Sequence, residues 1–90
     1  MEITYDPAKR DKTLNERGLD FEDAVEVFFG PEFTFPDSRK EYGEPRFTTV
    51  GYFNSRMTVV VWTPRDGGRR IISMRYANDR EISRYRNQLG

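Results

Sequence analysis

Hydrophobic residues follow two patterns along this chain, one in each half. The second half holds three apolar runs, at residues 47–53, 57–63 and 70–76. These runs are rich in β-branched and aromatic residues, a composition typical of strands. The segments that separate them, residues 54–56 and 64–68, contain the Asn, Ser, Asp and Gly residues that favour tight turns. The pattern therefore predicts two hairpins, and a further short strand is predicted at residues 3–5.

In the first half, apolar residues recur with helical spacing between capping residues. Asp6 and Pro7 supply an N-cap and a proline at the first helical position, and Gly18 is the C-cap that ends this helix. Asp20 is the N-cap of a second helix, which ends at Gly30. The apolar face of this second helix is Phe21, Ala24, Val25 and Phe28.

A last helix is predicted after the strands, with Asn78 as its N-cap and Glu81 at its third position. Its inward stripe is Ile82, Tyr85 and Leu89. Residues 31–45 are expected to form a loop, with a candidate extended piece near Phe33. The predicted order is β-α-α-β-β-β-α in one domain over residues 1–90. This is an α+β fold, an antiparallel sheet of about four strands with helices packed on one face.

The arginine in the last strand is the most informative feature of the pattern. Arg75 lies among apolar residues, where a buried and unpaired charge costs several kcal/mol, so an anionic group of the protein or of a ligand must face it. Alternation along the strand predicts two sets of residues that point to opposite faces. The helix-covered set is Arg70, Ile72, Met74 and Tyr76, and the open-face set is Ile71, Ser73 and Arg75.

Alternation in the first of the three runs adds residues to the open face. The predicted groove on that face holds Arg46, Thr48, Tyr52, Ser73 and Arg75. Arginines beside stackable rings suit single-stranded RNA. The alternative is that Arg46 and Arg75 form ordinary ion pairs with Glu41, Glu44 or Glu81. The residues alone leave both interpretations open.

The charges of the chain are divided between its halves. Residues 1–45 hold six Lys or Arg and twelve Asp or Glu, whereas residues 46–90 hold nine Arg and three acidic residues. Arg suits bidentate contacts with phosphate or carboxylate. The asymmetry indicates an anionic ligand or an acidic partner, unless the two halves neutralise each other in the fold.

The chain contains neither cysteine nor histidine. Disulfides, a thiolate nucleophile, a cysteine-based zinc site and a histidine general base are therefore excluded. No segment is apolar enough to span a membrane, and the N-terminus lacks the pattern of a signal peptide. We expect a cytoplasmic protein that uses no metal and no other cofactor.

One set of residues, spread over positions 3–85, stands in the order and spacing of a known family. Its members in the first half are Tyr5-Asp6, Lys9, Asn15, Gly18, Phe21-Glu22-Asp23-Ala24 and Val27-Phe28. In the second half they are Tyr42-Gly43-Glu44, Arg46, Gly51, Val59-Val60-Val61, Thr63, Arg70-Ile71-Ile72-Ser73, Arg75, Ala77, Glu81 and Tyr85. With these residues the chain resembles the BrnT family of type II toxins, small ribonucleases related in fold to the RelE toxins.

The resemblance implies a RelE-like toxin that cleaves messenger RNA without a metal and inhibits translation and growth. It also implies a hetero-oligomer with a BrnA-like ribbon-helix-helix antitoxin. In that complex, operator DNA is bound only by the antitoxin. The chain departs from the family at Arg17, where a histidine is common, and at Tyr5, where Trp is usual. Two alternatives follow: a catalytically impaired module that binds an antitoxin and regulates its promoter, and a non-catalytic RNA-binding domain.

The resemblance and the residue types together nominate a site. The candidate catalytic residues are Glu44 as general base, Arg46 and Arg75 as transition-state clamps, and Tyr85 as acid or stacking residue. The candidate RNA contacts are Lys9, Arg17, Tyr52, Arg70 and Ser73. The candidate antitoxin contacts are Arg80 and Arg84 on the last helix. Glu81, Lys9 and a tyrosinate are alternative bases. A capping or ion-pair role fits Glu44 equally well, and a solvated helix cation fits Lys9 better than an RNA contact.

Overall fold

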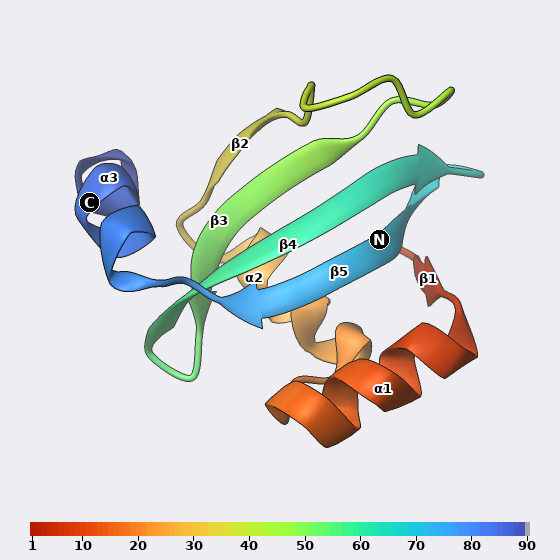
Figure 1. Ribbon diagram of the computed structural model, residues 1–90, viewed down its shortest axis with the longest axis horizontal. Helices are drawn as coiled ribbons and strands as arrows, with labels where there is room; N and C mark the ends of the chain where they lie inside the picture. Colours follow the sequence, from red (N-terminus) through yellow and green to blue (C-terminus); the bar gives the residue numbers. More distant parts are fainter. Residues whose placement is uncertain (90) are drawn as a thin grey trace.

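The computed structural model describes residues 1–89 and contains one sheet with three α-helices (Figure 1). The elements in chain order are β1 (Ile3–Tyr5), α1 (Pro7–Arg17), the 3-10 turn η1 (Phe21–Asp23), α2 (Ala24–Phe29), β2 (Phe33–Pro36), β3 (Phe47–Phe53), β4 (Arg56–Arg65), β5 (Gly68–Tyr76) and α3 (Asp79–Leu89). The sheet order is β1-β5-β4-β3-β2. Only the β1–β5 pair is parallel. The predicted α+β class, element order and antiparallel meander are confirmed, and β2 adds a fifth strand near Phe33.

Both hairpins of the meander close with two residues of positive φ. Asn54 and Ser55 have φ of 54° and 59°, and Asp66 and Gly67 have φ of 52° and 79°. Two-residue turns of this kind match the right-handed twist of the strands they join. They bring β3 against β4 and β4 against β5 in register over most of their length.

Helices α1 and α2 lie on one face of the sheet (Figure 1). The core on this face joins η1 and α2 to the side chains of β4 and β5 that point toward them; its fully buried members include Phe21, Val27, Val60, Ile71 and Met74. Helix α2 approaches β3 so closely at Gly51 that a Cβ there would lie 2.8 Å from Val27 Cγ1. Any larger residue at Gly51 would therefore push α2 away from the sheet.

Helix α3 packs against the opposite face, so the prediction that the helices share one face is wrong for this helix. Its predicted inward stripe of Ile82, Tyr85 and Leu89 is confirmed, but it contacts a second cluster that contains Val50 and Val59. Val59 and its neighbour Val60 belong to different clusters and point to opposite faces. Because β3 and β4 are apolar on both faces, the amphipathic α3 has valines to cover on the side that α2 leaves free.

A β-bulge in β5 corrects the predicted alternation. Val61 pairs with Ser73 and Trp62 pairs with Ile71, so Ile72 has no partner on β4. An extra residue in one strand reverses the alternation beyond it. Ile71, 1% exposed, therefore lies in the α2-side core together with Met74, while Ile72 is only half-buried. The placement of Met74 was right, and the placements of Ile71 and Ile72 were wrong.

Candidate active site

Most of the predicted site residues lie around three hollows. The first, the Glu44 cleft, has a volume of about 130 Å³ and lies beside the turn between β4 and β5. It is lined by Asp6, Lys9, Glu44, Arg46, Thr63, Arg65, Arg70, Ile71 and Ile72. Helix α1 contributes Lys9, the loop before β3 contributes Glu44, and β4 and β5 contribute the residues that flank their turn. Four predicted residues, Lys9, Glu44, Arg46 and Arg70, thus come together from distant parts of the sequence.

Polar atoms in the Glu44 cleft lack partners. Among residues 1–89, the buried side-chain atoms without a hydrogen bond are Glu44 Oε2, Arg46 Nε and Thr4 Oγ1. Two of these belong to the cleft lining, and Thr4 pairs with Arg70 in the sheet. Buried polar atoms are normally hydrogen-bonded, so a cluster of unsatisfied ones marks a place that a ligand or water would complete.

Most cations of the cleft have no carboxylate partner among the residues that the structure describes. Within residues 1–89, Lys9, Arg46 and Arg70 form no ion pair. The Arg46 guanidinium lies 3.9 Å from the centre of the Tyr42 ring, which holds it flat against the loop. Glu44 Oε2 lies 3.7 Å from an Arg65 nitrogen, beyond hydrogen-bond distance. The cleft therefore combines two carboxylates, Glu44 and the helix-capping Asp6, with several cations that are available to an anion.

The second hollow, the α1 groove, runs between α1 and β5 and shares Lys9 and Ile72 with the cleft. Its lining is Lys9, Lys12, Thr13, Glu16, Arg17, Ile72 and Ser73, and its volume is about 310 Å³. Arg17 donates a hydrogen bond of 3.1 Å to the Met74 carbonyl, on the part of β5 that β1 does not reach. Arg17 therefore ties α1 to the sheet edge.

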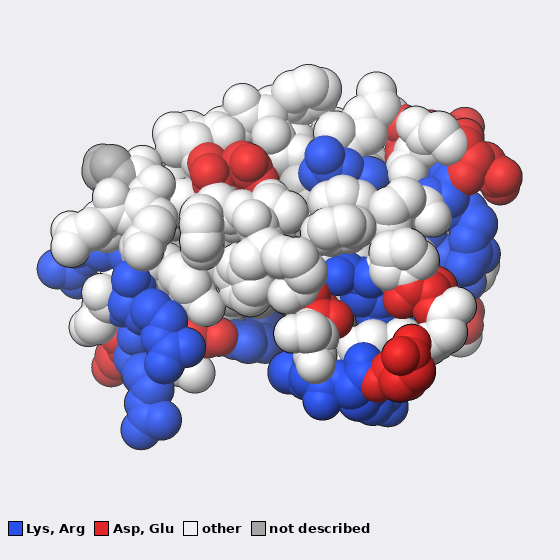
Figure 2. All heavy atoms as spheres, turned by 90° about the horizontal axis from the view of Figure 1, so that it is seen from above, with Lys and Arg blue, Asp and Glu red and all other residues white. Residues whose placement is uncertain are grey.

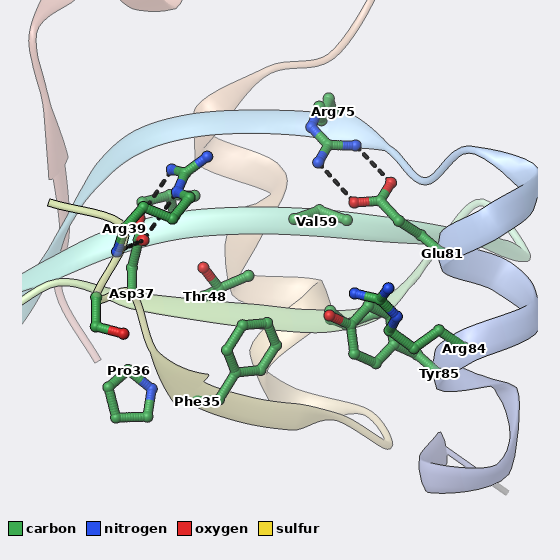
Figure 3. A pocket seen from close by; sticks show the side chains of 13 residues that line it. Phe35, Pro36, Asp37, Arg39, Thr48, Val59, Arg75, Glu81, Arg84 and Tyr85 are labelled. Atoms are coloured by element: carbon green, nitrogen blue, oxygen red, sulfur yellow. Dashed lines mark hydrogen bonds and ion pairs between the residues drawn. The ribbon is translucent and has the colours of Figure 1, made fainter.

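The third hollow, the α3 pocket, has a volume of about 380 Å³ and lies between the sheet, the end of β2 and α3 (Figure 3). Arg75 donates two hydrogen bonds of 2.7 Å to the two carboxylate oxygens of Glu81. This hydrogen bonding lowers the pKa of Glu81 to about 2. Glu81 also completes a capping box with Asn78, in which each residue accepts from the backbone N–H of the other. The anionic partner required by Arg75 thus comes from the protein.

The remaining predicted residues of the α3 pocket lie on its α3 wall (Figure 3). The Tyr85 ring stacks on Phe35 with ring centres 5.8 Å apart and an interplanar angle of 20°. Arg84 is exposed and lines the pocket, and Arg39 faces it from the other end, paired with Asp37 through two bonds of 2.9 Å. The pairing holds the pKa of Asp37 below its ordinary value.

The structure does not gather the predicted groove into one hollow. Arg46 lines the Glu44 cleft and Ser73 the α1 groove, while Thr48 and Arg75 line the α3 pocket. Tyr52 is exposed in a separate hollow at the far side of α3. The predicted residues are separated because alternate residues on one face of a strand are roughly 7 Å apart, and the predicted set extends along most of β3. Arg80 is exposed at the start of α3.

Some lining residues were missed by the sequence reasoning. Lys12 stands three positions after Lys9, and this helical spacing is a signal that both face the same way. Arg65 is the last residue of β4, beside the turn to β5, and Arg39 lies in the loop between β2 and β3, where spacing carries no such signal. The position of Arg39 depends on the fold of the long segment before β3.

Figure 2, which looks at the molecule from above the view of Figure 1, shows Lys and Arg gathered toward the two ends and largely uncharged residues between them. Among residues 1–89, no group of three or more Asp or Glu is placed to hold a metal ion. No helix in this same stretch is long and apolar enough to cross a membrane. Cations outnumber carboxylates in the lining of each of the three hollows.

The comparison with family models identifies the group of proteins to which this one belongs. Residues 5–81 match the model described as the ribonuclease toxin BrnT of type II toxin-antitoxin systems. The chain therefore belongs to the BrnT family of ribonuclease toxins. The match contains the whole Glu44 cleft and ends before Arg84 and Tyr85. A comparison with curated proteins found no match.

Proposed function

We propose that this protein is the toxin of a type II toxin-antitoxin pair and cleaves messenger RNA in the Glu44 cleft without a metal ion. Cleavage of messenger RNA in the cytoplasm would inhibit translation and growth. The observation that carries the proposal is the pair of buried atoms without a hydrogen bond, Glu44 Oε2 and Arg46 Nε. They lie in a cleft where Lys9, Arg46 and Arg70 form no ion pair within residues 1–89. A scissile phosphate would supply the acceptors that these cations lack.

The residues of the cleft suit the chemistry of a 2′-hydroxyl attack. Glu44 accepts the proton of the 2′-hydroxyl, whose oxygen then bonds to phosphorus while the bond from phosphorus to the 5′-oxygen breaks. Arg46 and Arg70 stabilise the charge that develops on the phosphoryl oxygens. Lys9 protonates the leaving 5′-oxygen. The products are a 2′,3′-cyclic phosphate and a 5′-hydroxyl.

The α1 groove supports a path for the RNA on one side of the cleft. It shares Lys9 with the cleft and continues past Lys12 and Thr13 to Arg17 and Ser73. Cations along a groove bind a phosphate backbone irrespective of sequence. Lys9, Arg17 and Ser73 are the RNA contacts on this path, and Tyr52 lies too far from the cleft to share it.

The partner in this proposal is a BrnA-like ribbon-helix-helix antitoxin. The exposed Arg80 and Arg84 on α3 offer charge to an acidic segment of such a partner. Operator DNA is then bound through the antitoxin alone. The catalytically impaired module is the second candidate, and Arg17 favours it, because an arginine bound to the Met74 carbonyl cannot act as a base in place of a histidine.

The test is cleavage of single-stranded RNA by the purified protein in the presence of a chelator. Glu44→Gln and Arg70→Ala should each lower the cleavage rate about a hundredfold or more. Arg56→Ala is the matched control, because Arg56 is exposed and stacks on Tyr76 far from the cleft, with its guanidinium 3.6 Å from the ring centre. Cleavage that requires a divalent ion, or that survives both cleft substitutions, contradicts the proposal. Binding of an antitoxin without cleavage supports the impaired module.

A further inference from the structure

We infer that the α3 pocket is a second nucleotide subsite, which holds the base and phosphate of the nucleotide next to the scissile bond. The inference rests on the proposed RNA cleavage in the Glu44 cleft. It assigns a ligand to a hollow whose α3 wall, from Arg84 onward, lies outside the part of the chain that matches the family model.

The size and surface of the α3 pocket fit one nucleotide. Its volume of about 380 Å³ lies in the range of small-molecule sites, which are mostly apolar with a few polar groups that orient the ligand. Val59 and Val61 form an apolar floor, and Thr48 adds a hydroxyl to it (Figure 3). The stacked rings of Tyr85 and Phe35 form one wall. A flat base can lie on this floor, with its edge toward the Thr48 hydroxyl.

The α3 pocket is next to the Glu44 cleft along the same strand. On β4, Val59 and Val61 line the pocket, and Thr63 and Arg65 line the cleft. Alternate residues of a strand are roughly 7 Å apart on one face, so the two hollows follow each other within the reach of neighbouring nucleotides. An extended single strand whose phosphate lies in the cleft therefore passes the pocket.

The charges at the rim leave one arginine free for a phosphate. Arg75 is paired with Glu81 and Arg39 with Asp37. Arg84 forms no ion pair with the carboxylates of residues 1–89, and it is exposed on the pocket rim. A phosphate at this rim meets Arg84 first, while the paired Arg75 keeps α3 in position.

An acidic peptide is a weaker fit to the same pocket. The carboxylates of Asp37 and Glu81 line it beside the arginines, so the charge of the whole lining is close to balanced and attracts an acidic segment little. A nucleotide brings one charge and a flat apolar face, which matches one free arginine over an apolar floor. We therefore assign the pocket to RNA and not to a protein segment.

The experiment measures the affinity of 2′-O-methyl oligonucleotides, which lack the attacking hydroxyl, as their length increases from two to six nucleotides. In the unaltered protein, one added nucleotide should strengthen binding about tenfold as its base enters the α3 pocket. Arg84→Ala and Thr48→Val should remove most of this step without weakening the shorter oligonucleotides. Arg86→Ala is the matched control, since Arg86 stands two residues after Arg84, roughly 200° around the helix, and lines a different hollow.

The outcomes separate this inference from the proposed cleavage. If the length step disappears in Arg84→Ala and Thr48→Val but no oligoribonucleotide is cleaved, the subsite stands and the cleavage proposal fails. If both variants bind every length as the unaltered protein does, the subsite is overturned, whether or not RNA is cleaved. Equal loss in Arg86→Ala overturns it as well, because the effect is then one of net charge. Loss of antitoxin binding alone in Arg84→Ala assigns the pocket rim to the protein partner instead.

Discussion

The Glu44 cleft and the α3 pocket are both lined by arginines and carboxylates, but they differ in how these groups are paired. In the α3 pocket, Arg75 binds Glu81 through two hydrogen bonds, and Arg39 binds Asp37 in the same way. In the Glu44 cleft, Arg46 and Arg70 have no carboxylate partner among residues 1–89, and Glu44 Oε2 has no hydrogen bond, although it lies 3.7 Å from an Arg65 nitrogen. The difference teaches that pairing, and not residue type, separates an arginine that holds the fold from one that is free to bind a ligand.

The two regions also differ in what positions them. The α3 pocket rests on strands and a helix that are fixed by the meander and by a capping box. The cleft depends on the segment before β3, where Glu44 stands between Gly43, with φ of 73°, and a proline. The Arg75–Glu81 pair thus occurs where a strand meets a helix, whereas Glu44 and Arg46 stand where a loop meets the sheet.

The largest effect should come from the cleft. Arg46→Ala removes a cation with no carboxylate partner, so RNA cleavage should fall about a hundredfold or more while the midpoint of thermal unfolding changes by only a few degrees. Cleavage rates and calorimetry on the same preparation measure both. A variant that loses stability and keeps its cleavage rate would assign Arg46 to the fold and end the distinction drawn between the two regions.

Arg75→Ala should have the opposite profile. It leaves Glu81, 20% exposed in its side chain, without its partner, and we expect a loss of about 2 kcal/mol in the free energy of unfolding. For a domain of this size that corresponds to a decrease of roughly 10 °C in the unfolding midpoint. Arg56→Ala serves as control. A fully stable Arg75→Ala protein that has lost all cleavage would return Arg75 to the catalytic role predicted from the sequence.

The same ion pair predicts a dependence of stability on pH. The Arg75 guanidinium lowers the pKa of Glu81 from an ordinary value of 4.5 to about 2 in the folded protein. The folded state therefore binds fewer protons, and the contribution of Glu81 to stability is complete above about pH 4.5 and lost as the pH falls toward 2. In Glu81→Gln, the free energy of unfolding should therefore fall less between about pH 4.5 and pH 2 than in the unaltered protein. Urea unfolding at several pH values in this range measures the difference. Glu16→Gln, a change at an exposed α1 residue, should leave this fall unchanged.

The smallest expected effect concerns the rate of association with an antitoxin. Exposed charges at Arg80 and Arg84 steer an acidic partner, so association should slow as salt is raised, and Arg80→Glu should slow it severalfold at low salt. Stopped-flow measurements at two salt concentrations give the result. If the rate is independent of salt and of Arg80, the partner binds elsewhere.

Much of the fold could be predicted, because its signals are local. Asp6 accepts a hydrogen bond from the Ala8 N–H, and Gly18 has φ of 70°, as the capping patterns indicated. The face covered by α3 could not be predicted, since β3 and β4 are apolar on both sides. The bulge at Ile72 could not be predicted either, because a bulge depends on how the strand pairs with its partner and not on the alternation within one strand.

The grouping of the candidate site residues could not be predicted from the sequence. Residue types pointed to Glu44, Arg46 and Arg70, which do lie together. The alternation of residues along the strands alone placed Arg46 and Arg75 in one groove, although the two residues line different hollows. The alternative of an ordinary ion pair with Glu81 is confirmed for Arg75. Distances along a strand and the pairing of charges require coordinates.

The bulge at Ile72 has a genetic consequence. Because this one unpaired residue sets the phase between the two parts of β5, a single-codon deletion of Ile72 would place Ile71 and Ser73 next to each other, opposite Trp62 and Val61. Strict alternation would then keep Met74, which is fully buried, in the core and Arg75 on the opposite face. Substitutions of Ile72 leave the faces of these residues unchanged as well. The position should therefore accept both exchanges of residue and the loss of this one residue.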